Sequence, residues 1–106
     1  MSGRDSQTWT FLTNHARVLI LIAETVGIRL RDVADQVGIT ERAAQRIVAE
    51  LEAAGYLTHD KVGRRNHYQL RPDVRLRHPL EHDVEIGKLL EVFVGRSILQ
   101  EAPPSE

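Results

Sequence analysis

The sequence has no cysteine and few aromatic residues. Without cysteine it forms no disulfide bond and has no thiolate to serve as a nucleophile or as a metal ligand. Only five of the 106 residues are aromatic, so the core must consist mainly of Leu, Ile, Val and Ala side chains, which suits packed helices. Hydrophobic residues make up 42% of the chain and charged residues 27%. This is the balance of an ordinary globular protein.

The sequence also lacks a long apolar run. A helix that spans a bilayer takes about 20 consecutive apolar residues, and no segment approaches that length. The start, Met-Ser-Gly-Arg-Asp, is not followed by an apolar signal segment. We therefore expect a cytoplasmic protein with no membrane partner. The length fits one compact domain with one appended element.

A strong net charge is missing as well, since the formal total is −1. DNA-binding domains are often basic overall, so the total alone does not favour a nucleic-acid partner. The distribution is uneven, however. Residues 61–77 have six Lys or Arg against one acid, a net of +5, and residues 78–106 have six acids against two cations, a net of −4. The chain therefore has a basic middle and an acidic C-terminal segment.

The spacing of apolar residues predicts three helices in the first half of the chain. Thr13 is suited to cap the first helix and Gly27 to end it. That helix contains the apolar run 18–23, which on length alone fits a buried strand equally well. Residues 30–37 place apolar side chains at i, i+3, i+4 and i+7, and residues 41–54 form another single apolar stripe.

A tight turn separates the second and third of these helices. Gly38 can adopt the positive φ that such a turn requires, and Thr40 is a good N-cap for the next helix. Ala34 is small enough to let the two helices approach closely. Gly55 ends the third helix.

After Gly55 the pattern changes from helix to strand. Residues 56–60 and 66–70 are short strand candidates, and residues 61–65 form a glycine-containing connection of hairpin length. Pro72 closes the second strand. A last helix is expected to begin near Pro79 or near Asp83. The expected organisation is an N-terminal arm (1–13), a main domain (14–77), a C-terminal helix (78–100) and a disordered tail (101–106).

A winged helix-turn-helix has this order of elements: two short helices joined by a tight turn, followed by a β-hairpin. The run ITERAAQRIVAELEAAGYL, residues 39–57, resembles the recognition helix of MarR- and ArsR-like regulators. The run GRRNHYQL, residues 63–70, is similar to the wing of the same families. The resemblance covers about residues 14–70. It implies a mostly α fold with a small β-hairpin (α+β), a winged helix-turn-helix with an additional C-terminal dimerisation helix.

The same resemblance implies a prokaryotic transcriptional regulator, a homodimeric repressor that binds double-stranded DNA in a sequence-specific manner. If the apolar stripe of the third helix faces the core, a helical wheel places its polar side chains on the opposite face. Arginine there can pair with guanine and glutamine with adenine. The other interpretation is an ordinary solvated face. The predicted recognition-helix residues are Thr40, Arg42, Gln45 and Arg46.

The hairpin between the two strand candidates is rich in cations and polar side chains. Adjacent arginines at the tip of a wing follow phosphates or enter the minor groove. On a hairpin of another kind they would only solubilise the turn. The predicted DNA-binding residues of the wing are Lys61, Arg64, Arg65, Asn66 and His67.

Five histidines raise the question of a metal site. On a helix, His78 and His82 would share one face at i, i+4. Pro79 lies between them, and no thiolate is present. Any further metal ligands would have to come from other parts of the chain or from a dimer partner. We therefore expect exposed or capping histidines and neither a metal nor a cofactor.

The final helix has an apolar stripe of its own. It can pack on the first helix of the same chain or meet a second copy of the chain, and we expect a homodimer, because the domain 14–70 already has a core. The predicted dimerisation residues are Ile86, Leu89, Leu90, Phe93 and Val94.

Two other functions are alternatives to a DNA-binding regulator. An enzyme is not expected, because no spacing pairs a nucleophile with a base and no glycine-rich phosphate loop is present. A winged helix that serves only protein–protein interaction is the alternative, and the low net charge favours it. The face with Arg42, Gln45 and Arg46 favours DNA instead. The resemblance also allows a small-molecule effector between the first helix and the last, with no residue that identifies it.

Overall fold

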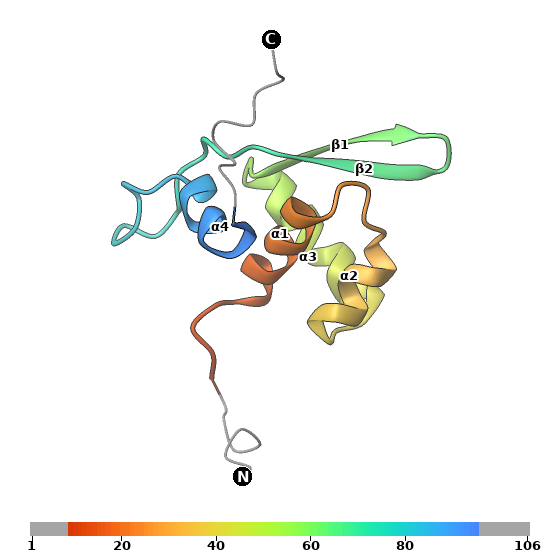
Figure 1. Cartoon of the computed structure of the whole chain (residues 1–106), viewed down its shortest axis with the longest axis horizontal. Helices are drawn as coiled ribbons and strands as arrows, with labels where there is room; N and C mark the ends of the chain where they lie inside the picture. Colours follow the sequence, from red (N-terminus) through yellow and green to blue (C-terminus); the bar gives the residue numbers. More distant parts are fainter. Residues whose placement is uncertain (1–8, 96–106) are drawn as a thin grey trace.

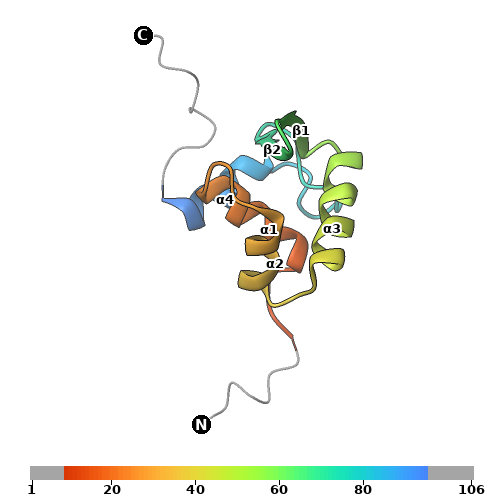
Figure 2. The same cartoon turned by 90° about the vertical axis from the view of Figure 1, so that its right-hand side faces the viewer.

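The structure, a computed structural model, describes residues 9–95. The three N-terminal helices form a group from which a two-stranded hairpin, the wing, projects to one side, while the last helix lies on the other side of the first (Figure 1; Figure 2). The expected mostly α fold with one β-hairpin is confirmed. In chain order the elements are α1 (Asn14–Glu24), α2 (Leu30–Val37), α3 (Glu41–Ala53), β1 (Leu57–Val62), β2 (Arg65–Leu70) and α4 (Ile86–Val94).

Helix α1 is the centre of the core, because it contacts α2, α3, α4 and β2. The apolar run 18–23 is helical, and Val18 and Leu19 within it are fully or almost fully buried. The Oγ1 atom of Thr13 accepts a hydrogen bond from the N–H of Ala16 at 3.2 Å, so the predicted cap is present. An apolar helix covered on several sides is what an almost continuous run of Val, Leu, Ile and Ala predicts.

The helix-turn-helix has the local structure predicted for it. Gly38 has a φ of +90°, in the left-handed region, and its N–H donates to the carbonyl of Ala34 at 2.8 Å. The side chain of Ala34 is buried, which allows the close approach of α2 and α3. Thr40 caps α3, since its Oγ1 accepts from the N–H of Ala43 at 3.0 Å. The angle between the two helices is therefore set by a glycine turn and a threonine cap.

The wing is longer and its turn is tighter than the sequence suggested. The two strands pair antiparallel from Leu57 opposite Leu70 to Val62 opposite Arg65. Only Gly63 and Arg64 are left in the connection, where five residues, 61–65, were expected. Gly63 has a φ of +66° at the first turn position, as in a type II′ turn, which matches the twist of the strands and lets the ladder continue to its end.

The last helix begins later than expected, at Ile86 and not near Pro79 or Asp83. Residues 72–85 fold back on themselves instead. The N–H of Leu76 donates to the carbonyl of Val84 at 2.9 Å, and Arg75 and Glu85 form an isolated β-bridge. These bonds close a segment of bends and turns, and the helix begins only after the bridge residue Glu85. Residues 96–100 of the predicted helix and the predicted tail, 101–106, lie outside the described residues.

Tyr56 connects the base of the wing to this folded-back segment. Its side chain is buried, and its hydroxyl donates to the carbonyl of Arg75 at 2.7 Å. Burial raises the pKa of the Tyr56 phenol above its ordinary value, because the phenolate loses solvation, and the charge of Arg77 partly offsets this rise. The buried phenol therefore serves as a neutral donor.

We expect the substitution Tyr56→Phe to lower the free energy of unfolding by about 0.5–1.5 kcal/mol near neutral pH, because one hydrogen bond is lost. The raised pKa also predicts that the wild type loses stability as pH rises above the ordinary value of 10.0, since the unfolded chain then releases a proton that the folded chain retains. The Phe variant should lose less over that range. Urea titrations of both proteins, with Tyr68→Phe as control, test this, and an identical alkaline decline would contradict it.

Candidate nucleic-acid interface

Helix α3 presents one buried and one exposed face, as the apolar spacing predicted. The buried side chains are Ala44, Ile47, Val48 and Leu51. On the other face, Arg42, Gln45 and Arg46 are exposed to solvent, and the small side chain of Ala49 lies exposed beside them. Two guanidinium groups and an amide therefore project outward from a helix whose position is set by the core beneath it.

The N-terminal end of α3 combines a cap with an acid. The side-chain oxygen of Thr40 is occupied as acceptor by the N–H of Ala43, while its hydroxyl hydrogen remains a donor. Glu41 follows in the first turn, where a carboxylate stabilises the helix dipole. This carboxylate also makes the start of α3 less attractive to a phosphate.

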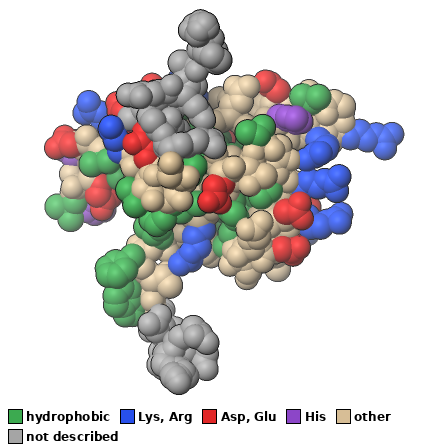
Figure 3. Space-filling model, viewed as in Figure 1, with side chains coloured by type: hydrophobic (Ala, Val, Ile, Leu, Met, Phe, Trp, Pro, Cys, Tyr) green, Lys and Arg blue, Asp and Glu red, His purple; other side chains and the backbone are tan. Residues whose placement is uncertain are grey.

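The predicted DNA-binding residues of the wing lie at different distances from its tip. Arg64 is in the two-residue turn at the tip and is exposed. Lys61 and Asn66 pair opposite each other, one position further from the tip than the pair that flanks the turn. His67 lies further along, opposite Asp60, and is only half-buried. Lys and Arg side chains gather on the side of the molecule where the tip of the wing and α2 project (Figure 3).

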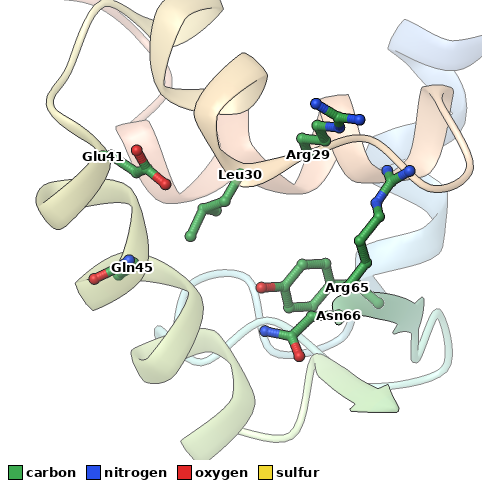
Figure 4. Close-up of a pocket in the computed structure, with 7 residues that line it drawn as sticks. Arg29, Leu30, Glu41, Gln45, Arg65 and Asn66 are labelled. Carbon is green, nitrogen blue, oxygen red and sulfur yellow. The ribbon is translucent and has the colours of Figure 1, made fainter. Parts of the chain in front are cut away.

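A concave surface, the valley, separates α3 from the wing. Figure 4 shows Glu41 and Gln45 on the α3 side, Arg65 and Asn66 on the β2 side, and Arg29 with its neighbour at the start of α2. The valley continues along α3 past Ala49, Glu52 and His59. Among the predicted residues it brings together Gln45, Arg65 and Asn66. The residues lining its first part are Arg29, Leu30, Glu41, Gln45, Arg65, Asn66 and Tyr68.

Arg65 follows Arg64 directly, in the pair with Val62 that flanks the two-residue turn, but its side chain is directed back toward the helices. It is the first residue of β2, and its guanidinium donates to the carbonyl of Gly27 in the turn between α1 and α2. This hydrogen bond joins residues 38 positions apart. Arg65 therefore braces the wing against the helical group, and Arg64 is the arginine that projects freely.

Two histidines lie against carboxylates on the C-terminal half of α3. The Nδ1 atom of His59, on β1, is within hydrogen-bonding distance of Glu52. The Nε2 atom of His15, on α1, is 2.7 Å from a carboxylate oxygen of Glu50. The first contact connects the wing to α3, in addition to the connection that Arg65 makes to the turn between α1 and α2. The sequence places His59 in the strand candidate 56–60, with either a phosphate contact or no contact expected, and its contact with Glu52 was not predicted.

Arg29 belongs to the valley although the sequence analysis did not single it out. It is the N-cap of α2, with an exposed side chain that makes no capping hydrogen bond. Its place next to the helix-turn-helix pattern was visible in the sequence. That its side chain shares a cavity with Gln45 and Asn66 depends on how α2 approaches β2, which no local pattern indicates.

His78 and His82 are not on a helix, so they do not share a face in the way considered above. The ring of His78 accepts from the N–H of Leu80 at 3.0 Å, and the ring of His82 is 3.3 Å from Asp83. Within residues 9–95 no group of three or more potential ligands is placed to hold a metal ion. No helix in the same range is long and apolar enough for a bilayer crossing.

The predicted dimerisation residues on α4 divide into two groups. Ile86 and Leu90 are buried in the core of their own chain, next to α1. Leu89 and Val94 are partly buried against that core. Phe93 is 43% exposed, and the neighbouring Val92, which was not predicted, is 75% exposed. The face of α4 that remains open therefore centres on residues 92–93.

Comparison with known proteins gives one match. Residues 10–65 match the family model described as MarR family, which is 56 of the 106 residues and extends from the N-terminal arm through the helix-turn-helix to the first residue of β2. No curated protein and no solved structure matches the chain.

The different surroundings of the two adjacent arginines lead to a prediction about stability. Arg65→Ala should lower the free energy of unfolding by about 0.5–1 kcal/mol, because an exposed charge-assisted hydrogen bond to Gly27 is lost. Arg64→Ala, the matched control, should stay within about 0.5 kcal/mol of the wild type. Urea unfolding monitored by circular dichroism measures both. Equal stability of the two variants would show that the brace contributes nothing.

Proposed function

The chain belongs to the MarR family of DNA-binding transcriptional regulators, and on that premise we propose that it is a homodimeric repressor that binds double-stranded DNA in a sequence-specific manner. The observation that supports this best is the exposed face of α3. Its opposite face is buried, so Arg42, Gln45 and Arg46 are presented from a rigid support. A helix of this kind fits the major groove of B-DNA.

The chemistry of this face is that of direct base readout. An arginine can donate two hydrogen bonds to the O6 and N7 atoms of guanine, and a glutamine can bond the N6 and N7 atoms of adenine. The small side chain of Ala49 leaves room for the helix to approach the bases. In this proposal Arg46 and Gln45 read bases, while Thr40 and Arg42 bond bases or the backbone at the edges of the face.

In this proposal the wing makes the DNA contacts that do not depend on the base sequence. Arg64 at its tip and Lys61 beside it are exposed cations at the end of a projecting hairpin, which suits phosphates or the minor groove. Asn66 and His67 add polar side chains closer to the body of the domain. A β-hairpin stiffened by the Arg65 brace holds these groups at a defined distance from α3.

The homodimer is proposed to form around the open face of α4. Exposed apolar side chains such as Val92 and Phe93 favour a covering partner. A twofold axis there would present two copies of α3 to half-sites about one helical turn apart. We place this dimer in the cytoplasm of a prokaryotic cell.

A small-molecule effector is the remaining partner in the proposal. A largely apolar cavity lies between the N-terminal arm, α1 and α4, with Leu19, Leu76 and Leu89 in its lining. Its lining of apolar groups with a few polar ones such as His15 suits a small organic ligand. Its position beside α4 would link such a ligand to the dimer.

We expect Arg46→Ala to weaken binding to the preferred duplex by about 1–3 kcal/mol and to relax the preference at one base pair. Arg64→Ala is the contrasting variant. It should weaken all duplexes similarly and reduce the slope of log K against log salt by about 0.9. Fluorescence anisotropy with labelled duplexes, including the region upstream of the gene, measures both at several salt concentrations.

An unchanged base preference in the first variant would remove Arg46 from base readout. If the wild type binds no duplex even at low salt, the chain is better described as a protein–protein interaction module. In that case a protein partner should be sought.

Phe93→Asp should convert the dimer to monomers, because a carboxylate cannot be buried unpaired in an apolar interface. Phe93 is more exposed than its predicted neighbours on α4, so the change spares the core of the chain. Val26→Asp, at another strongly exposed apolar residue, is the control and should leave the mass unchanged. Light scattering gives the mass of each protein, and a dimer in the Phe93 variant would move the interface elsewhere.

A further inference from the structure

Adjacent grooves of B-DNA are separated by a single sugar–phosphate strand, and this constrains what can occupy the valley. If α3 enters the major groove and the wing tip reaches the neighbouring minor groove, the strand between the two grooves must pass between α3 and the wing. The inference therefore rests on the proposed function. The structure shows a concave surface at this place, lined by both elements (Figure 4).

The end of the valley next to α2 offers donors for a phosphate. Figure 4 shows the guanidinium groups of Arg29 and Arg65 at the same end of the cavity. Within the described part of the chain, no carboxylate or hydrogen-bond partner engages the Arg29 side chain. A guanidinium has five N–H donors, so Arg65 retains donors beyond the one that Gly27 receives. The amide of Asn66, also on β2, lines the valley further from Arg29 (Figure 4).

The opposite side of the same cavity is negatively charged. Glu41 places a carboxylate there, on the first turn of α3 (Figure 4). A phosphate is repelled by this carboxylate and attracted by the two guanidinium groups. The charge difference across the valley therefore fixes where along the strand a phosphate can sit, at the Arg29 end.

We propose that the valley holds the DNA strand that separates the two grooves, and that Arg29 binds one of its phosphates and so positions α3 along the duplex. Arginine suits this task because its planar fork bonds two phosphate oxygens at once. Arg65 supports the site from the wing while it remains tied to Gly27. Arg29 contacts no base in this arrangement, so it contributes affinity and register but no base preference.

The test compares Arg29→Ala with Arg31→Ala in the full chain. Arg31 is also exposed on α2, and it does not line the valley, which makes it a matched control. The Arg29 side chain makes no capping hydrogen bond, so its removal should leave the fold intact. Thermal unfolding of both variants verifies this. The probe is the duplex that the wild type binds best, together with duplexes in which single phosphates are replaced by neutral methylphosphonates.

We expect Arg29→Ala to bind the unmodified duplex about tenfold more weakly and to reduce the salt slope by about 0.9. One methylphosphonate position that weakens the wild type should have no effect on this variant, because the contact is already lost. Arg29→Lys should retain the salt slope and recover part of the affinity. Arg31→Ala should behave as the wild type at every position.

The result that would overturn the inference is an Arg29→Ala protein with the affinity, salt slope and methylphosphonate pattern of the wild type. The proposed function would then still stand, because the wild type binds DNA in that experiment. A wild type that binds no duplex is a different outcome. It would overturn the proposed function, and the assignment of the valley with it.

Discussion

The burial of α1 is the constraint on which the other elements depend. Its apolar side chains, Val18, Leu19 and Ile22 among them, are covered by α2, α3, α4 and β2. Because one helix serves as the common partner, each surrounding element has to turn its own apolar face inward. Helix α3 does so with Ile47 and Leu51, and this leaves its arginine-bearing face exposed. The packing that buries the apolar face of α3 therefore also exposes its polar face.

The wing depends on connections of another kind. A two-stranded hairpin is at best marginally stable alone, and here its base and both of its strands are tied to the body. Tyr56 bonds the folded-back segment, His59 lies against Glu52 on α3, and Arg65 bonds the turn before α2. These polar contacts set the distance between the wing and α3, and this distance defines the valley.

Helix α4 shows how one apolar stripe can serve two purposes. Leu90 is completely buried against the core of its own chain, while Phe93 three residues later is 43% exposed. The start of the helix is set by the folded-back segment, whose β-bridge ends at Glu85. The inner side of the stripe therefore completes the domain. Its outer side remains available for the dimer proposed above.

The sequence by itself determined the features that depend on neighbours in the chain. The stripe of α3, the left-handed Gly38 and the Thr40 cap follow from helical periodicity and backbone sterics within a few residues, and they were predicted correctly. The tertiary structure alone decided the start of α4, the brace formed by Arg65 and the place of Arg29 in the valley. Each of these depends on a contact between segments far apart in the chain, such as Arg65 with Gly27. Local periodicity contains no information on such contacts, because they form only when the core has brought the segments together.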